Sequence, residues 1–111
     1  MEWKVTYYSE ALQQEILSLP LGLQARYIHL TARMCIYGAN LGMPHTKPMK
    51  NGLFELRLKS KEGIGRVLYC TLINKRIVML HCFVKKSQKT PTNDLKLAIS
   101  RMKEVKLNVD A

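Results

Sequence analysis

The sequence predicts an α+β fold, in which a strand and two helices precede three consecutive strands and a closing helix. Three short apolar runs, rich in β-branched or aromatic residues, occupy residues 53–58, 67–73 and 77–84, with turn-forming or charged residues between them. Residues 21–37 carry apolar side chains at helical spacing, and so does the segment after Pro91. Strands gathered in one block between helices are typical of an α+β domain.

Length and composition indicate one small globular domain. A chain of 111 residues has room for a single domain, over residues 1–111, with one modest core. Its 47% hydrophobic and 23% charged residues match a soluble protein. No apolar run approaches the roughly 18 residues that a membrane span needs, and the N-terminal residues lack the apolar core of a signal peptide. We therefore expect a cytoplasmic protein without a membrane partner.

The charge balance is strongly basic. The chain has 18 Lys and Arg residues against 8 Asp and Glu residues, which gives a formal net charge of +10. Self-repulsion at this level opposes folding, so a polyanionic partner is expected. Nucleic acid is the first candidate, an acidic protein the second and an anionic membrane surface the third.

Neither a metal, a cofactor nor a disulfide framework is predicted. The cysteines are odd in number and form no C-x-x-C motif, and the histidines share no metal-ligand spacing. Carboxylates are too few and scattered for a two-metal nuclease, and no Gly-rich phosphate loop is present. The cysteines are expected to be small buried hydrophobes in a reducing compartment: Cys35, Cys70 and Cys82.

The N-terminal half predicts one strand and two helices. Residues 3–8 alternate loosely, as in a strand. Ser9 is placed to cap the helix that follows, and Pro20 ends it. The next helix covers residues 21–37 and ends at Gly38. Its apolar stripe, expected to face the core, has the spacing i, i+4, i+7, i+11: Leu23, Tyr27, Leu30 and Met34.

The C-terminal half predicts a loop, a three-stranded antiparallel meander and a helix. Residues 38–52 predict a long loop. In the first meander strand, residues 54, 56 and 58 look like core, and Glu55 and Arg57 lie on a more exposed face with Leu53. The other two runs are apolar on both faces, as in central strands. With the first strand, the meander makes a four-stranded sheet. Thr92 is placed to cap the last helix, whose apolar stripe is Leu95, Ala98, Ile99 and Met102.

Cations follow the predicted meander and the loop before it. A sheet that holds this much positive charge near its ends is suited to phosphate. Two lysines of the loop, Lys47 and Lys50, either clamp a nucleic acid backbone or are simply solvated. The cations of the meander and of the segment after it are Arg57, Lys59, Lys61, Arg66, Lys75, Arg76, Lys85, Lys86 and Lys89.

Each candidate for chemistry also has a structural interpretation. Arg57 is either a phosphate ligand or a surface arginine paired with a nearby glutamate. Arg66 opens its strand, where arginine suits a phosphate but is also ordinary. His81, inside an apolar strand, is either an acid or base or a satisfied core residue. Lys85 and Lys86 are adjacent and point to opposite faces, so one of them enters any site.

Metal-free RNA cleavage fits this set of residues. In that reaction the 2′-hydroxyl attacks the adjacent phosphate, and the enzyme stabilises the crowded phosphorane and protonates the leaving 5′-oxygen. Arginine and lysine can stabilise the phosphorane. Histidine, or a lysine whose pKa is lowered by neighbouring cations, can transfer the protons.

Five motifs, in this order and at these gaps, resemble a known family. They are Lys47, GLFELR at residues 52–57, GRVLY at 65–69, LHCFVKK at 80–86 and QKTP at 88–91. Together they resemble the HigB-type toxins of the RelE/ParE superfamily, specifically the phage-derived Gp49-like branch. The resemblance implies a RelE-like fold over about residues 47–101 and, more loosely, the whole chain.

The resemblance also implies a function. It implies a toxin of a type II toxin–antitoxin pair: a ribosome-dependent endoribonuclease that enters the ribosomal A site and cuts mRNA without a metal. The implied partner is a HigA-like helix-turn-helix antitoxin, through which alone the toxin contacts operator DNA. By position, Arg57 and Arg66 would hold the scissile phosphate and His81 or Lys86 would transfer protons. Further cations would bind RNA: Lys47, Lys50, Lys59, Lys85 and Lys89.

Two departures from the family pattern and two other functions are weighed. Gly65 replaces an aromatic residue, which suggests a lost base-stacking surface, and Phe54 stands where tryptophan is common. One alternative function is ParE-like inhibition of gyrase through protein–protein contact. The other is a basic RNA-binding module without catalysis.

Overall fold

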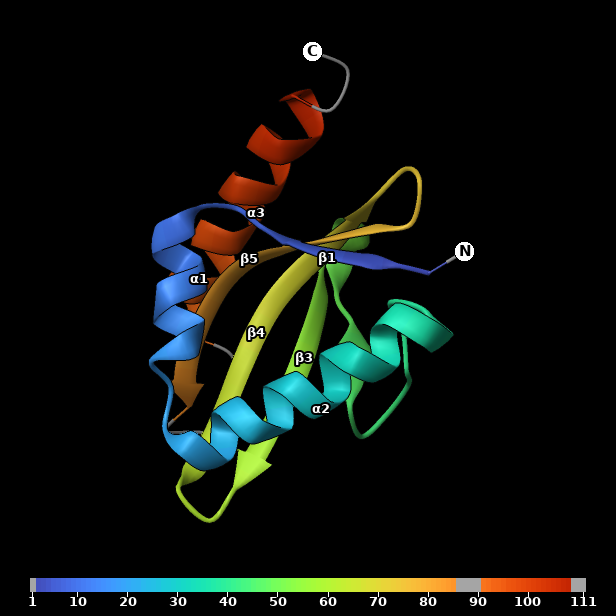
Figure 1. The fold of residues 1–111 in the computed structure, drawn as a ribbon. Coiled ribbons are helices and arrows are strands. Elements are labelled where there is room, and N and C mark those ends of the chain that lie inside the picture. The colour runs from blue at the N-terminus through green and yellow to red at the C-terminus, as the bar shows by residue number, and fades with distance from the viewer. Residues whose placement is uncertain (1, 86–90, 109–111) are drawn as a thin grey trace.

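A five-stranded mixed sheet forms the middle layer of the protein, with strand order β1-β5-β4-β3-β2. The computed structural model describes residues 2–85 and 91–108. Helices α1 and α2 cross one face of the sheet and α3 lies on the other (Figure 1). The elements are β1 (Lys4–Tyr7), α1 (Glu10–Leu17), α2 (Leu21–Tyr37), β2 (Thr46–Pro48), a 3₁₀ turn (Lys50–Gly52), β3 (Phe54–Ser60), β4 (Gly63–Leu72), β5 (Arg76–Lys85) and α3 (Thr92–Asn108).

The predicted α+β class is confirmed, and so is the antiparallel meander of β3, β4 and β5. β1 joins the sheet at its edge, parallel to β5. The hairpin between β4 and β5 turns at Asn74 and Lys75, both with φ near +60° (62° and 57°), as the tight turns that join twisted strands require.

The predicted strand count was wrong by one. β2 lies within residues 38–52, which were expected to be a loop, and it pairs antiparallel with β3 from Thr46↔Leu56 to Pro48↔Phe54. Three residues are too few to show a period of two, and proline is tolerated there because β2 is an edge strand. The buried Thr46 hydroxyl donates to the Asn40 side chain at 2.8 Å and so fixes the loop against the strand.

The first apolar layer lies between the sheet and helices α1 and α2. Ser9 caps α1 by accepting a hydrogen bond from the Leu12 backbone N–H at 3.1 Å, and Gly38, with φ of 110°, ends α2. Both features confirm the sequence prediction. The predicted stripe of α2 is buried against the sheet: Leu23, Tyr27, Leu30 and Met34.

The second apolar layer lies between the sheet and α3. Ala98 and Met102 of α3 are buried in it, as predicted, against Leu53, Leu68, Cys70, Val78 and Leu80. One expectation was wrong: Leu53 and Glu55 are not exposed but retain only 1% and 4% of their accessible surface. Leu53 packs with α3 in the second apolar layer, and Glu55 faces the buried Arg66. No described helix is long and apolar enough to cross a membrane.

Candidate functional site

Three rows of paired residues bring most of the predicted cations onto one face of the sheet. In the middle row Arg57 pairs with Arg66, and Arg66 with Phe83. The flanking rows lie two residues along each strand and therefore on the same face. They are Lys47–Glu55–Leu68–His81 and Lys59–Ile64–Lys85. We call the five cations of these rows the cationic face: Lys47, Arg57, Lys59, Arg66 and Lys85.

Of the other predicted site cations, one lies off this face and two lie outside the described residues. Lys50 is exposed in the 3₁₀ turn and belongs to none of the three rows. Lys86 and Lys89 lie outside the described residues, so their predicted roles stay predictions.

A β-bulge in β5 places Lys85 on the cationic face. Leu68 pairs with His81 but the next residue, Tyr69, pairs with Met79, which leaves Leu80 as an extra residue. Before the bulge Met79 faces α1 and α2, and strict alternation would carry Lys85 to that side. The extra residue reverses the alternation, so His81 and Lys85 lie on the α3 side of the sheet.

Arg66 is a buried arginine, not the strand-end residue that the sequence suggested. It lies inside β4 with 3% of its surface exposed. Its Nε is 3.4 Å from Oε1 of Glu55, and its terminal NH1 donates to the Gly65 carbonyl at 2.9 Å. Burial lowers the pKa of Arg66, and Arg57 lowers it further, whereas Glu55 opposes the change. The ion pair between Glu55 and Arg66 was not expected from the sequence, because it depends on the register between β3 and β4.

Arg57 remains available to a ligand. It is half-buried, directly opposite Arg66, and its NH1 lies 3.5 Å from the sulfur of Met43. A thioether is a weak acceptor that an incoming phosphate oxygen can displace. The backbone N–H of Arg57 donates to the His45 carbonyl at 2.8 Å, which fixes the position from which the side chain leaves the sheet.

Lys85 has the electrostatics of a proton carrier. Burial lowers its pKa, and the nearby charges of Arg66, Arg57 and Lys47 lower it further, with Glu55 acting in the opposite direction. A lysine that gives up its proton below its usual pKa of about 10.5 is a stronger acid than one in water. The sequence predicted that one of Lys85 and Lys86 would enter the site. Lys85 lies on the cationic face, and Lys86 lies outside the described residues.

His81 is tied to α3 and withdrawn from the open surface. Its Nε2 lies 2.5 Å from Oδ1 of Asp94, and its ring stacks on Phe83 with centroids 5.9 Å apart. Its Nδ1 is buried and has no hydrogen-bond partner among the described residues. Asp94 was not predicted as the partner of His81. An acidic residue in the first turn of a helix is explained by its favourable interaction with the helix dipole alone. This geometry makes His81 a positioning residue for the start of α3.

We predict that His81 and Asp94 stabilise the fold as a coupled pair. His81→Ala and Asp94→Ala should each lower the free energy of unfolding in urea. The double variant should lose less than the sum of the two, by about 1.5–3 kcal/mol, because each single change already removes the shared hydrogen bond. Asn93→Ala, in the same exposed turn, is the control and should change little. Additive losses would contradict the pairing.

Gly65 does not mark a lost base-stacking surface. A Cβ built at Gly65 would lie 3.3 Å from Leu23 Cδ1 and 3.7 Å from Leu58, on the side of the sheet that α2 covers. An aromatic residue there would enter the core and could not reach the cationic face. This corrects the interpretation of the departure from the family pattern.

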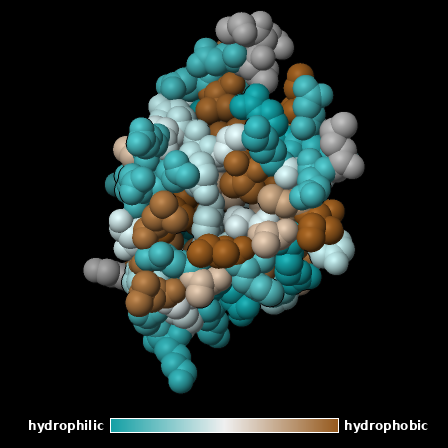
Figure 2. Space-filling model, viewed as in Figure 1, coloured by the Kyte–Doolittle hydropathy of each residue, from teal (hydrophilic) through white to brown (hydrophobic). Residues whose placement is uncertain are grey.

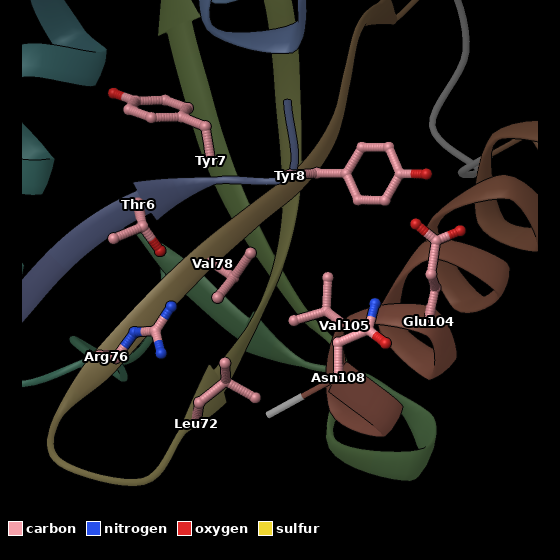
Figure 3. A pocket seen from close by; sticks show the side chains of 9 residues that line it. All are labelled: Thr6, Tyr7, Tyr8, Leu72, Arg76, Val78, Glu104, Val105 and Asn108. Atoms are coloured by element: carbon pink, nitrogen blue, oxygen red, sulfur yellow. The ribbon is translucent and has the colours of Figure 1, made fainter. Parts of the chain in front are cut away.

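A cavity of about 420 Å³ lies at the other end of the α3 side, between β1, β5 and α3 (Figure 3). Arg76 and Glu104 are its charged lining residues, and one charge of each sign gives it no preference for anions. The Arg101 guanidinium lies 4.7 Å from the centre of the Tyr8 ring beside it. This cavity is therefore distinct in place and charge from the cationic face.

The fold and the site define a small α+β protein with a cationic sheet face suited to phosphate. Among the residues that the structure describes, no three His, Cys, Asp or Glu side chains are grouped to hold a metal ion. A family model for phage-derived Gp49-like proteins matches residues 14–103. The chain therefore belongs to this family, which is one of RelE/HigB-like toxins. No curated protein matches the chain.

Proposed function

We propose that this protein is the toxin of a type II toxin–antitoxin pair and acts as an endoribonuclease on translated mRNA. Membership of a family of RelE/HigB-like toxins supports the toxin class. The main support for nuclease activity is that Arg57 and Arg66 lie directly opposite each other on neighbouring strands. Like charges directly opposite each other destabilise a sheet, so such a pair is retained where it has an anion to bind.

The remaining charges of the cationic face strengthen this argument. Glu55 lies against Arg66, yet Arg57 and three lysines share the same three rows. Lys47 lies on the edge strand β2, and Lys85 lies on β5, at the β5 end of a different row. A single-stranded RNA laid across the strands would meet cations on β2, β3 and β5, with the charge of the buried Arg66 beneath it on β4. Phosphate is the ligand that such a row of cations attracts.

Three of these cations have a role in the proposed cleavage. The 2′-oxygen forms a bond to phosphorus while the bond from phosphorus to the 5′-oxygen breaks, which leaves a 2′,3′-cyclic phosphate and a 5′-hydroxyl. Arg57 donates to the non-bridging oxygens, where negative charge accumulates, and the buried Arg66 adds positive charge beneath them. Lys85 gives its proton to the leaving 5′-oxygen. The proton of the 2′-hydroxyl passes to a base, for which Lys86 and His81 are the sequence-predicted groups.

The proposed partners follow from the family and from the charge. The ribosomal A site presents mRNA between rRNA phosphates, which a chain of charge +10 approaches readily. A helix-turn-helix antitoxin would neutralise the toxin and would carry it to operator DNA. Both partners are part of the proposal.

We predict that Lys85 sets the alkaline limb of the pH profile. Because Lys85 acts as an acid, kcat/KM for mRNA cleavage should fall as pH rises through its pKa. That pKa should lie below the value of about 10.5 for a free lysine. Lys85→Arg does not titrate in this range, so this limb should disappear and the residual rate should be low. A limb that survives the substitution would assign the acid to another group.

The proposal is tested by primer extension on a reporter mRNA after brief induction of the protein, beside the Arg57→Ala variant. Cuts inside translated codons that vanish in the variant would support the ribosome-linked nuclease. Growth arrest with intact mRNA would overturn it in favour of gyrase inhibition. Intact mRNA with normal growth would overturn it in favour of a basic RNA-binding module.

A further inference from the structure

Helix α2 carries a second apolar stripe that faces solvent. Its residues follow the spacing i, i+4, i+7, i+11, i+15, and at about 100° per residue they lie nearly opposite the buried stripe. Leu21, Ile28 and Ile36 keep 77%, 59% and 66% of their surface exposed. Brown side chains gather along α2 in Figure 2. We call this set the outer stripe: Leu21, Ala25, Ile28, Ala32 and Ile36.

The outer stripe is unusual for a surface helix. A helix at the surface of a globular protein normally turns one apolar face to the core and a polar face to water. Single exposed apolar residues are ordinary, but an aligned set that runs the length of a helix marks an interaction surface. Two further exposed apolar residues flank the stripe in sequence. Leu17 of α1, 45% exposed, precedes Leu21 by one helical turn's spacing, and Tyr37, 72% exposed, directly follows Ile36. The stripe spans about 22 Å at 1.5 Å per residue, which suits a partner helix of about 15 residues.

One flank of the outer stripe is cationic. Arg26, His29 and Arg33 have the spacing i, i+3, i+7 and lie about 90° around the helix from the stripe. His45 adjoins this flank, because Arg33, Arg26 and His29 all lower its pKa after the larger effect of burial. Within the described part of the chain, no carboxylate forms an ion pair with Arg26 or Arg33. The opposite flank carries the neutral polar residues Gln24 and Thr31.

We propose that the outward face of α2 is the docking surface for an acidic amphipathic helix of a partner protein. The apolar face of such a helix would cover the outer stripe with anchors at i, i+3, i+4 and i+7. Its acidic side would lie along Arg26, His29 and Arg33. The surface is independent of the proposed nuclease activity, because α2 and the cationic face lie on opposite sides of the sheet.

Charge argues against a second copy of this chain as the occupant. Two α2 helices packed antiparallel through the outer stripe would bring their cationic flanks together. In either orientation the two chains would each carry a formal charge of +10. An acidic helix meets neither penalty. An anionic membrane would satisfy the charges too, but membrane-surface helices typically have tryptophan or phenylalanine in the apolar face, and the outer stripe has neither.

The test uses a labelled 18-residue peptide, helical by design, with leucines at i, i+3, i+4 and i+7 and glutamates along one flank. Fluorescence anisotropy with the full chain should give saturable binding. The same peptide with lysine in place of each glutamate should bind at least tenfold more weakly. Ile28→Gln, and separately Arg26→Gln with Arg33→Gln, should each weaken binding of the acidic peptide at least tenfold. These side chains are solvent-facing, so the variants should keep the wild-type melting temperature.

Two controls place the surface. Ile73→Gln removes an equally exposed isoleucine from the β4–β5 hairpin and should leave binding unchanged. Arg57→Ala, on the cationic face, should also bind the peptide normally. Equal binding of both peptides, or no effect of Ile28→Gln, would overturn the proposal. It would equally be overturned if Ile28→Gln abolished a dimer of the free chain, or if phosphatidylglycerol vesicles bound the chain through α2 and the acidic peptide did not.

Discussion

Arg57→Ala is expected to lower kcat for cleavage of ribosome-bound mRNA by about 10²–10³, the usual cost of removing one donor to a developing negative charge. Arg57 is the better probe of the two arginines because it is half-buried and its NH1 contacts the weakly accepting sulfur of Met43, whereas Arg66 is buried against Glu55. Its loss should therefore leave the fold intact. Cleavage is measured by primer extension in a translation reaction, and folding by thermal melting.

A matched control separates catalysis from general attraction to RNA. Arg76→Ala removes the same charge at the end of β5 that lies away from Lys85 and the cationic face. There the residue is exposed and borders the separate cavity. It should weaken RNA binding slightly, in a salt-dependent way, and leave kcat unchanged. If Arg57→Ala and Arg76→Ala have equal effects, Arg57 contributes only to background charge and the catalytic assignment is wrong.

Much of the fold could be predicted from the spacing of apolar residues along the sequence. The core stripe of α2, the cap at Ser9 and the central position of β4 and β5 all follow from residue spacing that the sequence displays directly. β2 could not be found this way, because three residues show no period and its pairing with β3 depends on contacts outside the segment. The exposed outer stripe was not predicted from the sequence, and its exposure follows from the way α2 packs on the sheet.

The candidate site was harder to predict because it depends on register. The sequence pointed to the right strands for Arg57 and Arg66, yet it could not show that they lie opposite each other. Nor could it show that Glu55 forms an ion pair with Arg66. The bulge at Leu80 determines on which face of the sheet Lys85 lies. The sequence does not reveal the bulge, because this strand is apolar on both faces. The pairing of His81 with Asp94 joins a strand to a helix across a turn, beyond the reach of any local pattern.

The buried pair of Glu55 and Arg66 predicts the largest stability effect. Glu55→Ala should lower the free energy of unfolding by about 3–5 kcal/mol, because it removes the carboxylate that faces a guanidinium with 3% of its surface exposed. The double variant Glu55→Leu with Arg66→Met should recover most of that loss, since similar apolar volume replaces both charges. Urea unfolding measures both, with Glu62→Ala, an exposed glutamate in the next turn, as the control.

A second substitution of Glu55 tests the electrostatics of the site. Glu55 opposes the lowering of the Lys85 pKa, so Glu55→Gln should move the alkaline limb of kcat/KM to lower pH. A shift to higher pH, or no shift, would mean that Lys85 does not sense this carboxylate.

If the double variant is as unstable as Glu55→Ala, packing and not the buried charge accounts for the loss. Arg66 therefore serves the fold and the proposed chemistry together, because the ion pair that holds its guanidinium inside β4 also keeps it opposite Arg57.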